Sequence, residues 1–247
     1  MAPRVVVIGL ASDYGCQVQL TNMGGQLLDA LGLIDLSYWQ LVSSGHMPTE
    51  YDVAIIEGAV TTEEHQALLR QVRSTASTVI AIGACAITGG IPGLANHGAL
   101  EKHAQSVYAA EKDTVAAGRV SPTPIESVIE VDYHVPGCPI QPAEFLSVLQ
   151  KALRGLGNRV PREPLCAECK VTETVCFYEK GIVCLGLVSR AGCGAVCVVH
   201  GRPCTACRGI NEDANLDTAR DIAQKHSVSP AALDVALDLY NSTSGVR

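Results

Sequence analysis

Eleven cysteines are the residues of this sequence best suited to chemistry, and eight of them lie within 42 residues. This run, residues 166–207, begins with one C-x-x-C pair and ends with a second. Eight thiolates make two complete sets of four, the number that both structural zinc sites and iron–sulfur clusters use. The eight are Cys166, Cys169, Cys176, Cys184, Cys193, Cys197, Cys204 and Cys207.

Three kinds of site could account for this cysteine run. Its loose spacings, such as Cys193-x3-Cys197, and its many valines and leucines favour iron–sulfur clusters, whose potential depends on a dry environment. A double zinc module is the alternative, because zinc knuckles use the same C-x-x-C pairs. A disulfide framework ranks last, since a chain of 247 residues can build its own core.

The other three cysteines are far apart in the first 158 residues. Cys16 and Cys85 each follow a predicted strand, and Cys138 follows the extended stretch IEVDYHVPG. Because ligands bind beyond the carboxyl ends of parallel strands, we expect these three to converge on one site. Asp13 precedes Cys16 at the C-x-x-C offset. We favour its carboxylate as a fourth iron ligand, with two alternatives: a cap on the following helix, or an iron left open to water.

The elements that must position these residues alternate between strand and helix. Apolar, β-branched runs at residues 5–10, 52–59 and 77–85 predict strands buried on both faces. Helical spacing marks residues 17–32, and Thr61 or Thr62 could cap a helix that runs through Val72. A further helix begins near Pro142 and ends before Gly155 or Gly157. This order predicts an α/β fold with a parallel sheet between helices.

Cysteine density and the stretch GLGNRVPREPL divide the chain into two predicted domains, residues 1–158 and 159–247. The second has little regular periodicity before two predicted helices, at residues 216–226 and 229–240, the later one with Ser229 as its cap. We therefore expect a small irregular domain around the cysteine run.

Composition narrows the classes of function. A net charge of −7 argues against a nucleic-acid partner. No stretch approaches ~18 uninterrupted apolar residues, so no membrane span is expected. Only 17% of residues are charged, which suggests that a protein partner covers part of the surface. The opening MAPRVVVIGL lacks a secretory or twin-arginine leader, so the expected location is cytoplasmic.

The motifs DYGCQVQL, IIEGAV, IGACA, PGCPIQP and GRPCTAC resemble, in this order, those of the small subunit of [NiFe] hydrogenases. The resemblance is strongest to the cytoplasmic, cofactor-coupled (group 3) enzymes, which include deazaflavin-reducing, NAD(P)-linked and heterodisulfide-reductase-linked hydrogenases. It extends to about residue 210. It implies a flavodoxin-like domain, a small cluster-binding domain, and a row of clusters that connects a nickel–iron large subunit to an outside acceptor.

The resemblance also implies three ligand sets and three [4Fe-4S] clusters. Asp13 stands where the family has the first cysteine of a C-x-x-C pair, and Cys166 stands where the family often has a histidine. Some relatives have only three medial cysteines and a three-iron cluster, and here Cys197 adds the fourth. The implied sets are Asp13, Cys16, Cys85 and Cys138 (proximal), Cys166, Cys169, Cys176 and Cys184 (distal), and Cys193, Cys197, Cys204 and Cys207 (medial).

The expected function is therefore that of an oxidoreductase subunit that relays electrons and makes no substrate bond itself. Its expected partners are the large subunit and a flavin-containing or ferredoxin-like acceptor subunit. The alternatives are a zinc-stabilised interaction module and a complex-I-like, quinone-reducing subunit.

Four other residues and one loop carry smaller expectations. Glu57 is either a carboxylate close to the proximal site or a solvated strand-end group. His134 and His200 could bond a cluster sulfur, although satisfied loop histidines are more common. Trp39 is expected in the core, and the loop at residues 89–98 lacks the pattern of a phosphate cradle.

Overall fold

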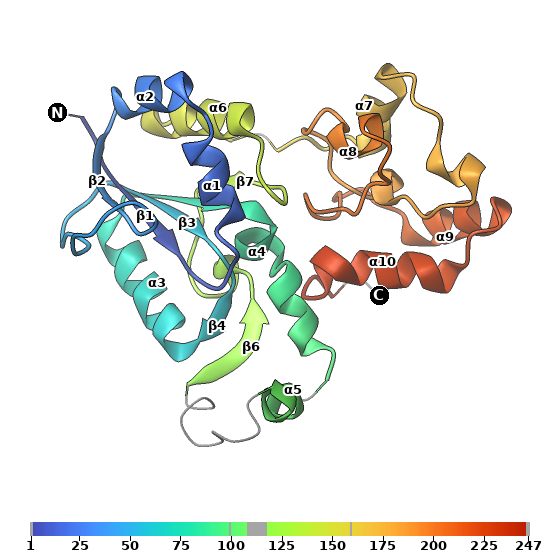
Figure 1. Ribbon diagram of the computed structural model, residues 1–247, viewed down its shortest axis with the longest axis horizontal. Helices are drawn as coiled ribbons and strands as arrows, with labels where there is room; N and C mark the ends of the chain where they lie inside the picture. Colours follow the sequence, from blue (N-terminus) through green and yellow to red (C-terminus); the bar gives the residue numbers. More distant parts are fainter. Residues whose placement is uncertain (1, 99, 108–117, 159, 246–247) are drawn as a thin grey trace.

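The computed structural model describes residues 2–98, 100–107, 118–158 and 160–245, and a five-stranded parallel sheet forms its centre (Figure 1). The strand order is β2-β1-β3-β5-β7. The order in which strands are added therefore reverses beside β1, as it does in flavodoxin-like sheets. The three strands predicted from apolar runs are present. The strands are β1 (Arg4–Gly9), β2 (Asp35–Trp39), β3 (Val53–Glu57), β5 (Thr78–Ile82) and β7 (Tyr133–Val135).

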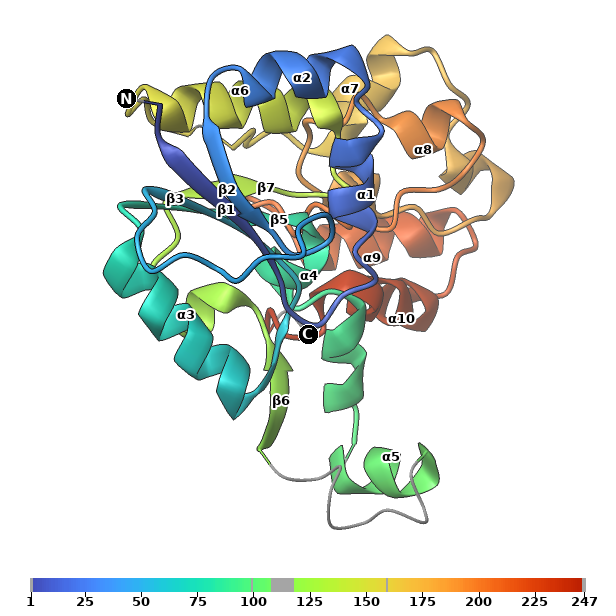
Figure 2. The ribbon, with the colours of Figure 1, turned by 60° about the vertical axis from the view of Figure 1, so that its left-hand side comes forward.

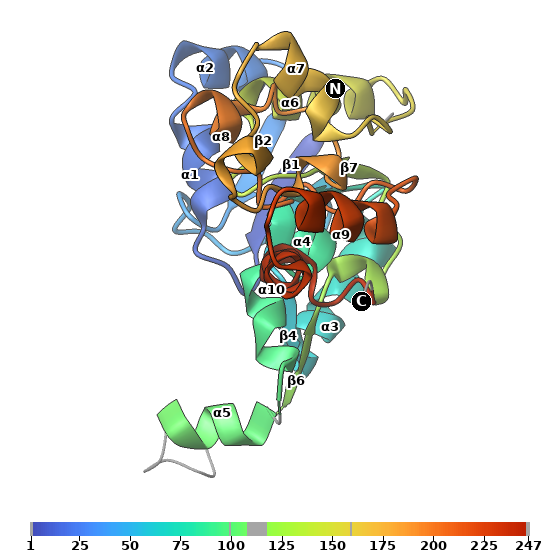
Figure 3. The same ribbon diagram turned by 90° about the vertical axis from the view of Figure 1, so that its right-hand side faces the viewer.

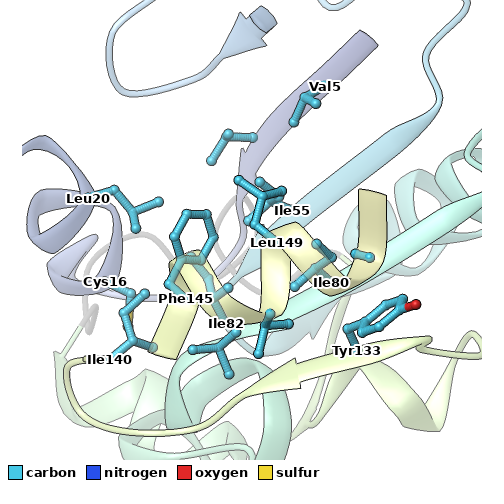
Figure 4. Close-up of a cluster of buried hydrophobic side chains, with 14 of the residues drawn as sticks. Val5, Cys16, Leu20, Ile55, Ile80, Ile82, Tyr133, Ile140, Phe145 and Leu149 are labelled. Atoms are coloured by element: carbon cyan, nitrogen blue, oxygen red, sulfur yellow. The ribbon is translucent and has the colours of Figure 1, made fainter. Parts of the chain in front are cut away.

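Helices cover both faces of this sheet, as expected for a parallel sheet (Figure 2). One face packs against α1 (Gly15–Thr21), α2 (Gly25–Leu31) and α6 (Pro142–Leu153). Figure 4 shows Phe145 of α6 and Leu20 of α1 in this layer. The other face packs against α3 (Glu63–Thr75) and α4 (Gly83–Thr88). Alternate residues of β1 enter the two layers, because successive side chains of a strand point to opposite faces.

The helix predicted at residues 17–32 is two helices, and this part of the prediction is wrong. Gly24, between α1 and α2, has φ of 58°, a backbone conformation that ends a right-handed helix. The apolar spacing continues across the break because both helices pack on the same face of the sheet. Trp39 is buried as expected, and its Nε1–H donates to Gln17 Oε1 at 2.8 Å, which ties β2 to α1.

The predicted cap at Thr62 is confirmed, since its hydroxyl accepts the backbone N–H of His65 at 3.1 Å. Ser229 precedes α10 (Pro230–Asn241) as predicted but makes no side-chain cap bond.

A second, two-stranded sheet was not predicted. It pairs β4 (Val60–Thr62) with β6 (Arg119–Thr123) in antiparallel fashion. The loop at residues 89–98 contains η1 (Ile91–Asn96), which precedes α5 (Leu100–Val107). Figure 3 shows α5 projecting away from the rest of the chain.

The cysteine-rich part has a hydrophobic core of its own, built around Leu185, Val198 and Leu233. Its elements are α7 (Leu165–Val171), η3 (Phe177–Lys180), η4 (Leu185–Leu187), α8 (Val196–Val199), α9 (Leu216–Lys225) and α10 (Pro230–Asn241). Short helices thus occupy a stretch that was expected to be irregular. The domain boundary at 158/159 stays a prediction, and residue 159 lies outside the described residues.

The last helix, α10, returns to the first part of the chain (Figure 1). The Thr88 hydroxyl, at the end of α4, donates to the backbone carbonyl of Tyr240 at 2.6 Å. The Thr243 hydroxyl donates to the carbonyl of Thr88 at 2.8 Å. Within the described ranges, no helix has the length and apolar character needed to cross a bilayer.

Candidate functional site

The proximal site lies at the carboxyl end of the sheet. Gly9, Glu57, Ile82 and Val135 are aligned across β1, β3, β5 and β7, and a chain segment leaves the sheet just after each of them. These segments carry the proximal residues, and parallel strands bring such segments to one edge.

A hollow of ≈ 70 Å³ forms where these segments meet. All four predicted proximal residues line it, and so does Glu57. The lining is Asp13, Gly15, Cys16, Glu57, Gly83, Ala84, Cys85, Gly137, Cys138 and Pro139. The structure therefore brings together, in one place, the residues that the sequence placed 125 positions apart, from 13 to 138.

Two glycines make room for the thiols. A Cβ on Gly83, whose φ is 84°, would lie 2.5 Å from Cys16 Sγ. A Cβ on Gly90 would lie 2.9 Å from Cys85 Sγ and would also meet the Cys85 backbone. Neither position can carry a side chain without displacing a sulfur, so the backbone is shaped around the thiols.

Two carboxylates hold the N-terminus of α1. The N–H of Gly15 donates to Asp13 Oδ1 at 2.9 Å. Those of Cys16 and Gln17 donate to Glu57 at 3.0 and 3.3 Å. Asp13 therefore makes one capping contact, the role that competes with iron ligation. The N–H of Cys16 is bound by Glu57 instead.

The interpretation of Glu57 as a solvated strand-end carboxylate is wrong, because it is only 2% exposed. Burial raises the pKa of Glu57, and the hydrogen bonds from Cys16 and Gln17 oppose the rise. Burial, and then the charge of Glu57, raise the pKa of Cys16. Figure 4 shows Cys16 beside Ile140, at the edge of the apolar layer.

Tyr240 of α10 is a proximal neighbour that the sequence did not reveal. Burial raises its pKa, and its hydroxyl hydrogen-bonds Cys138. Burial also raises the pKa of Cys138, while this hydrogen bond opposes the rise. The α10 periodicity predicted a helix but carried no signal for its docking against α4.

The four predicted distal cysteines are neighbours. Burial, followed by the thiols of Cys184, Cys169 and Cys176, raises the pKa of Cys166 to about 11. A Cβ on Gly186 would lie 3.3 Å from Cys166 Sγ and 3.7 Å from Cys184 Sγ.

The Tyr178 hydroxyl is buried against this distal group, with the Cys184 backbone as its polar neighbour, and within the described chain its O–H donor has no acceptor. An orphaned donor beside four thiols fits a sulfur-rich group at this position.

The four predicted medial cysteines also gather, and they contact both other groups. Burial raises the pKa of Cys207 to about 11, a hydrogen bond from the Cys138 backbone opposes this, and the thiols of Cys138, Cys197 and Cys193 add to it. The backbone N–H of Cys204 donates to Cys184 Sγ at 3.3 Å. The medial group therefore lies between the proximal and the distal groups.

The two histidines considered as sulfur partners, His134 and His200, differ in their surroundings. His134 Nε2 lies 3.4 Å from Glu126 Oε1, and burial lowers its pKa, so it has the satisfied surroundings expected of a structural histidine. His200 is exposed at the end of α8. All eleven cysteines are free thiols, so the structure does not support the disulfide framework.

The sequence of this chain is similar to those of several known proteins. Residues 14–152, more than half of the chain, match the family described as NADH ubiquinone oxidoreductase, 20 Kd subunit. A subunit of the F420-non-reducing hydrogenase of Methanococcus voltae is 31% identical, over 98% of this chain and 92% of the relative. The iron-sulfur subunit of the F420-non-reducing hydrogenase of Archaeoglobus profundus is 26% identical, over 85% of this chain and 83% of the relative.

A solved NAD⁺-reducing [NiFe]-hydrogenase in its H₂-reduced state contains a similar chain. The TM-score is 0.57 at 26% identity, over 65% of this chain and 96% of that one. The 20 Kd family match ends before the cysteine run, whereas the hydrogenase relatives span it, so the quinone-reducing alternative is not favoured. The chain therefore belongs to the family of small, electron-transferring subunits of [NiFe] hydrogenases.

Proposed function

We propose that this chain relays single electrons through three [4Fe-4S] clusters, between a nickel–iron large subunit and a flavin-containing or ferredoxin-like partner. The observation that carries this proposal is the placement of twelve donor side chains in three groups, the medial one in contact with both others. When bound, the clusters supply reversible one-electron transfer. The chain holds them, fixes their spacing and keeps water from their sulfurs.

The surroundings of the cysteines support clusters over zinc. Cys184 and Cys204 are buried in the same apolar cluster as Leu185, Val188 and Val198. A dry shell of this kind suits a redox cluster, whose potential depends on its environment.

Exposed apolar side chains support two protein partners. One set belongs to α1, α2 and the segments after α2 and β2; it comprises Val18, Leu28, Leu33, Leu41 and Val42. Another lies among the distal and medial cysteines, and comprises Val171, Val175, Ile182 and Val199. We assign the first set to the large subunit and the second to the electron acceptor. A partner protein would cover these exposed apolar side chains.

The cytoplasm is the proposed location. Eleven free thiols fit a reducing compartment.

Metal analysis of protein purified without oxygen tests the proposal. We expect about twelve irons per chain, as three four-iron clusters require, and a brown colour that dithionite bleaches. A colourless protein with two zinc ions would instead support the interaction module. Purification from the native host would identify the co-purifying subunits. An assay with dihydrogen and candidate acceptors would then identify the electron acceptor.

A further inference from the structure

Arg208 is a cation enclosed inside the protein. Its residue exposure is 2%, and it is the largest of the fully buried side chains in the described chain. A guanidinium in such a dry site is costly unless it is paired and fully hydrogen-bonded. Arg208 therefore needs partners that balance its charge and accept its N–H groups.

Four hydrogen bonds hold this guanidinium in place. Nη1 and Nη2 donate to the two carboxylate oxygens of Glu144, at 2.6 and 2.8 Å. Nη1 also donates to the carbonyl of Pro136 at 2.9 Å, and Nε donates to the carbonyl of Ala191 at 2.8 Å. The planar fork of arginine can make this set of bonds, and the point charge of lysine cannot.

These bonds join the segments that carry two of the ligand groups. Pro136 lies two residues before the proximal Cys138, and Ala191 lies two residues before the medial Cys193. Arg208 itself follows the medial Cys207.

A Cβ on Gly192, next to Cys193, would collide with Arg208 Nη2. Glycine at this position therefore leaves room for the guanidinium. One side chain thus fixes the junction between the proximal and medial groups.

The charge of Arg208 lies beside the medial thiols. Arg208 follows Cys207 in the chain, and its Nη2 lies against Gly192, next to Cys193. The ion pair with both carboxylate oxygens of Glu144 keeps the guanidinium charged. A cluster gains negative charge on reduction, so a fixed cation beside its ligands favours the reduced state.

We propose that Arg208 is the positioning residue of the proximal–medial junction and that its charge raises the reduction potential of the medial cluster. This inference rests on the proposed function, because it needs a cluster at the medial cysteines. Glu144, as the counter-ion, lowers the same potential by a smaller amount.

The test uses the assembled complex, purified without oxygen, with each cluster followed by EPR during a redox titration. In R208M, the ratio of reduced to oxidised medial cluster at a fixed solution potential should fall about tenfold, which is 59 mV for one electron. In E144Q, the ratio should rise, because the counter-ion is lost and the amide oxygen still accepts from Arg208. R208K keeps the charge but loses the hydrogen bonds of the guanidinium, so the medial potential should remain near wild type while electron transfer between the proximal and medial clusters slows.

Arg73 offers a matched control. It pairs with Asp132 at 2.7 Å and donates to the carbonyls of Ala76 and Ser77, but it lies at the opposite end of the sheet. R73M should lose stability and leave the medial potential unchanged.

Two results would overturn the inference while leaving the proposed function intact. One is a wild-type chain with about twelve irons whose medial potential is the same in R208M. The other is a shift of R208M and E144Q in the same direction, which would indicate a structural disturbance instead of an electrostatic effect. Iron-free wild-type protein would overturn the proposed function, and the inference with it.

Discussion

Asp13 allows the sharpest test of the proximal site, because two roles compete for one carboxylate. Its Oδ1 accepts the N–H of Gly15 at 2.9 Å, and its side chain lines the same hollow as Cys16, Cys85 and Cys138. Three substitutions separate the roles. D13N keeps an acceptor oxygen but is a poor iron ligand, D13C supplies a thiolate at the same offset, and D13A removes both functions.

The cap role has a modest magnitude. Losing an N-terminal side-chain acceptor costs about 1 kcal/mol, within a range of roughly 0.5–2 kcal/mol. For a chain of this length, 1 kcal/mol corresponds to a fall in Tm of about 2–4 °C. D13A should therefore lower the Tm of the metal-free chain by this amount, and D13N should lower it by less. The helix should survive, because Glu57 holds the next two N–H groups.

Ligation predicts an electronic effect that capping cannot produce. A thiolate donates more electron density to iron than a carboxylate does, so D13C should lower the proximal potential. D13N should lose about one iron per chain, because the fourth iron has no protein ligand. Redox titration followed by EPR, with iron analysis of the same samples, measures both. If D13N and D13C keep the wild-type EPR spectrum, potential and iron content, then Asp13 only caps α1.

Three further predictions concern residues within and beside the predicted ligand groups. E57Q should destabilise the metal-free chain by about 1–3 kcal/mol in urea unfolding, because a neutral amide offers one oxygen to two buried N–H donors; unchanged stability would contradict this role. Y240F should lower the proximal potential, because the donor to Cys138 is lost, whereas Y178F should change only the distal signal. In metal-free protein, burial raises the pKa of Cys85 from an ordinary 9.0 to about 11, so its alkylation at pH 8 should be about a hundredfold slower than in urea. The rate should rise about tenfold per pH unit up to that pKa, and the stability due to this buried thiol should be lost between pH 9 and 11; a flat pH profile would contradict both.

Much of the proximal site could be predicted from sequence, because it depends on a rule of topology. Parallel strands must present their carboxyl ends on one edge, so residues that follow separate apolar runs have to meet there. Cys16 and Cys85 follow β1 and β5, and both line the hollow. Residues 13 and 16 also keep the offset of a C-x-x-C pair, a local feature that needs no knowledge of long-range contacts.

What could not be predicted depends on contacts across the fold. The α1–α2 break leaves the apolar spacing unchanged, because both helices pack on one face. The burial of Glu57 follows from the arrival of the α1 N-terminus above β3, which periodicity does not encode. Tyr240 lies 102 residues from Cys138, so only the docking of α10 brings them together.

The same long-range contacts decide how the proposed route is ordered. Of the three groups, the medial one meets both others, through Cys207 with Cys138 and through Cys204 with Cys184. Electron transfer between fixed centres depends on their spacing, so the elements that hold these two meeting points control the route. Arg208 holds the first from inside, through Pro136 and Ala191. Asn241 of α10 donates to the carbonyl of Ala206 at 3.2 Å, between the two cysteines of the last C-x-x-C pair. The proposed route therefore depends on α6 and α10, which carry none of the predicted ligands, as well as on the ligands themselves.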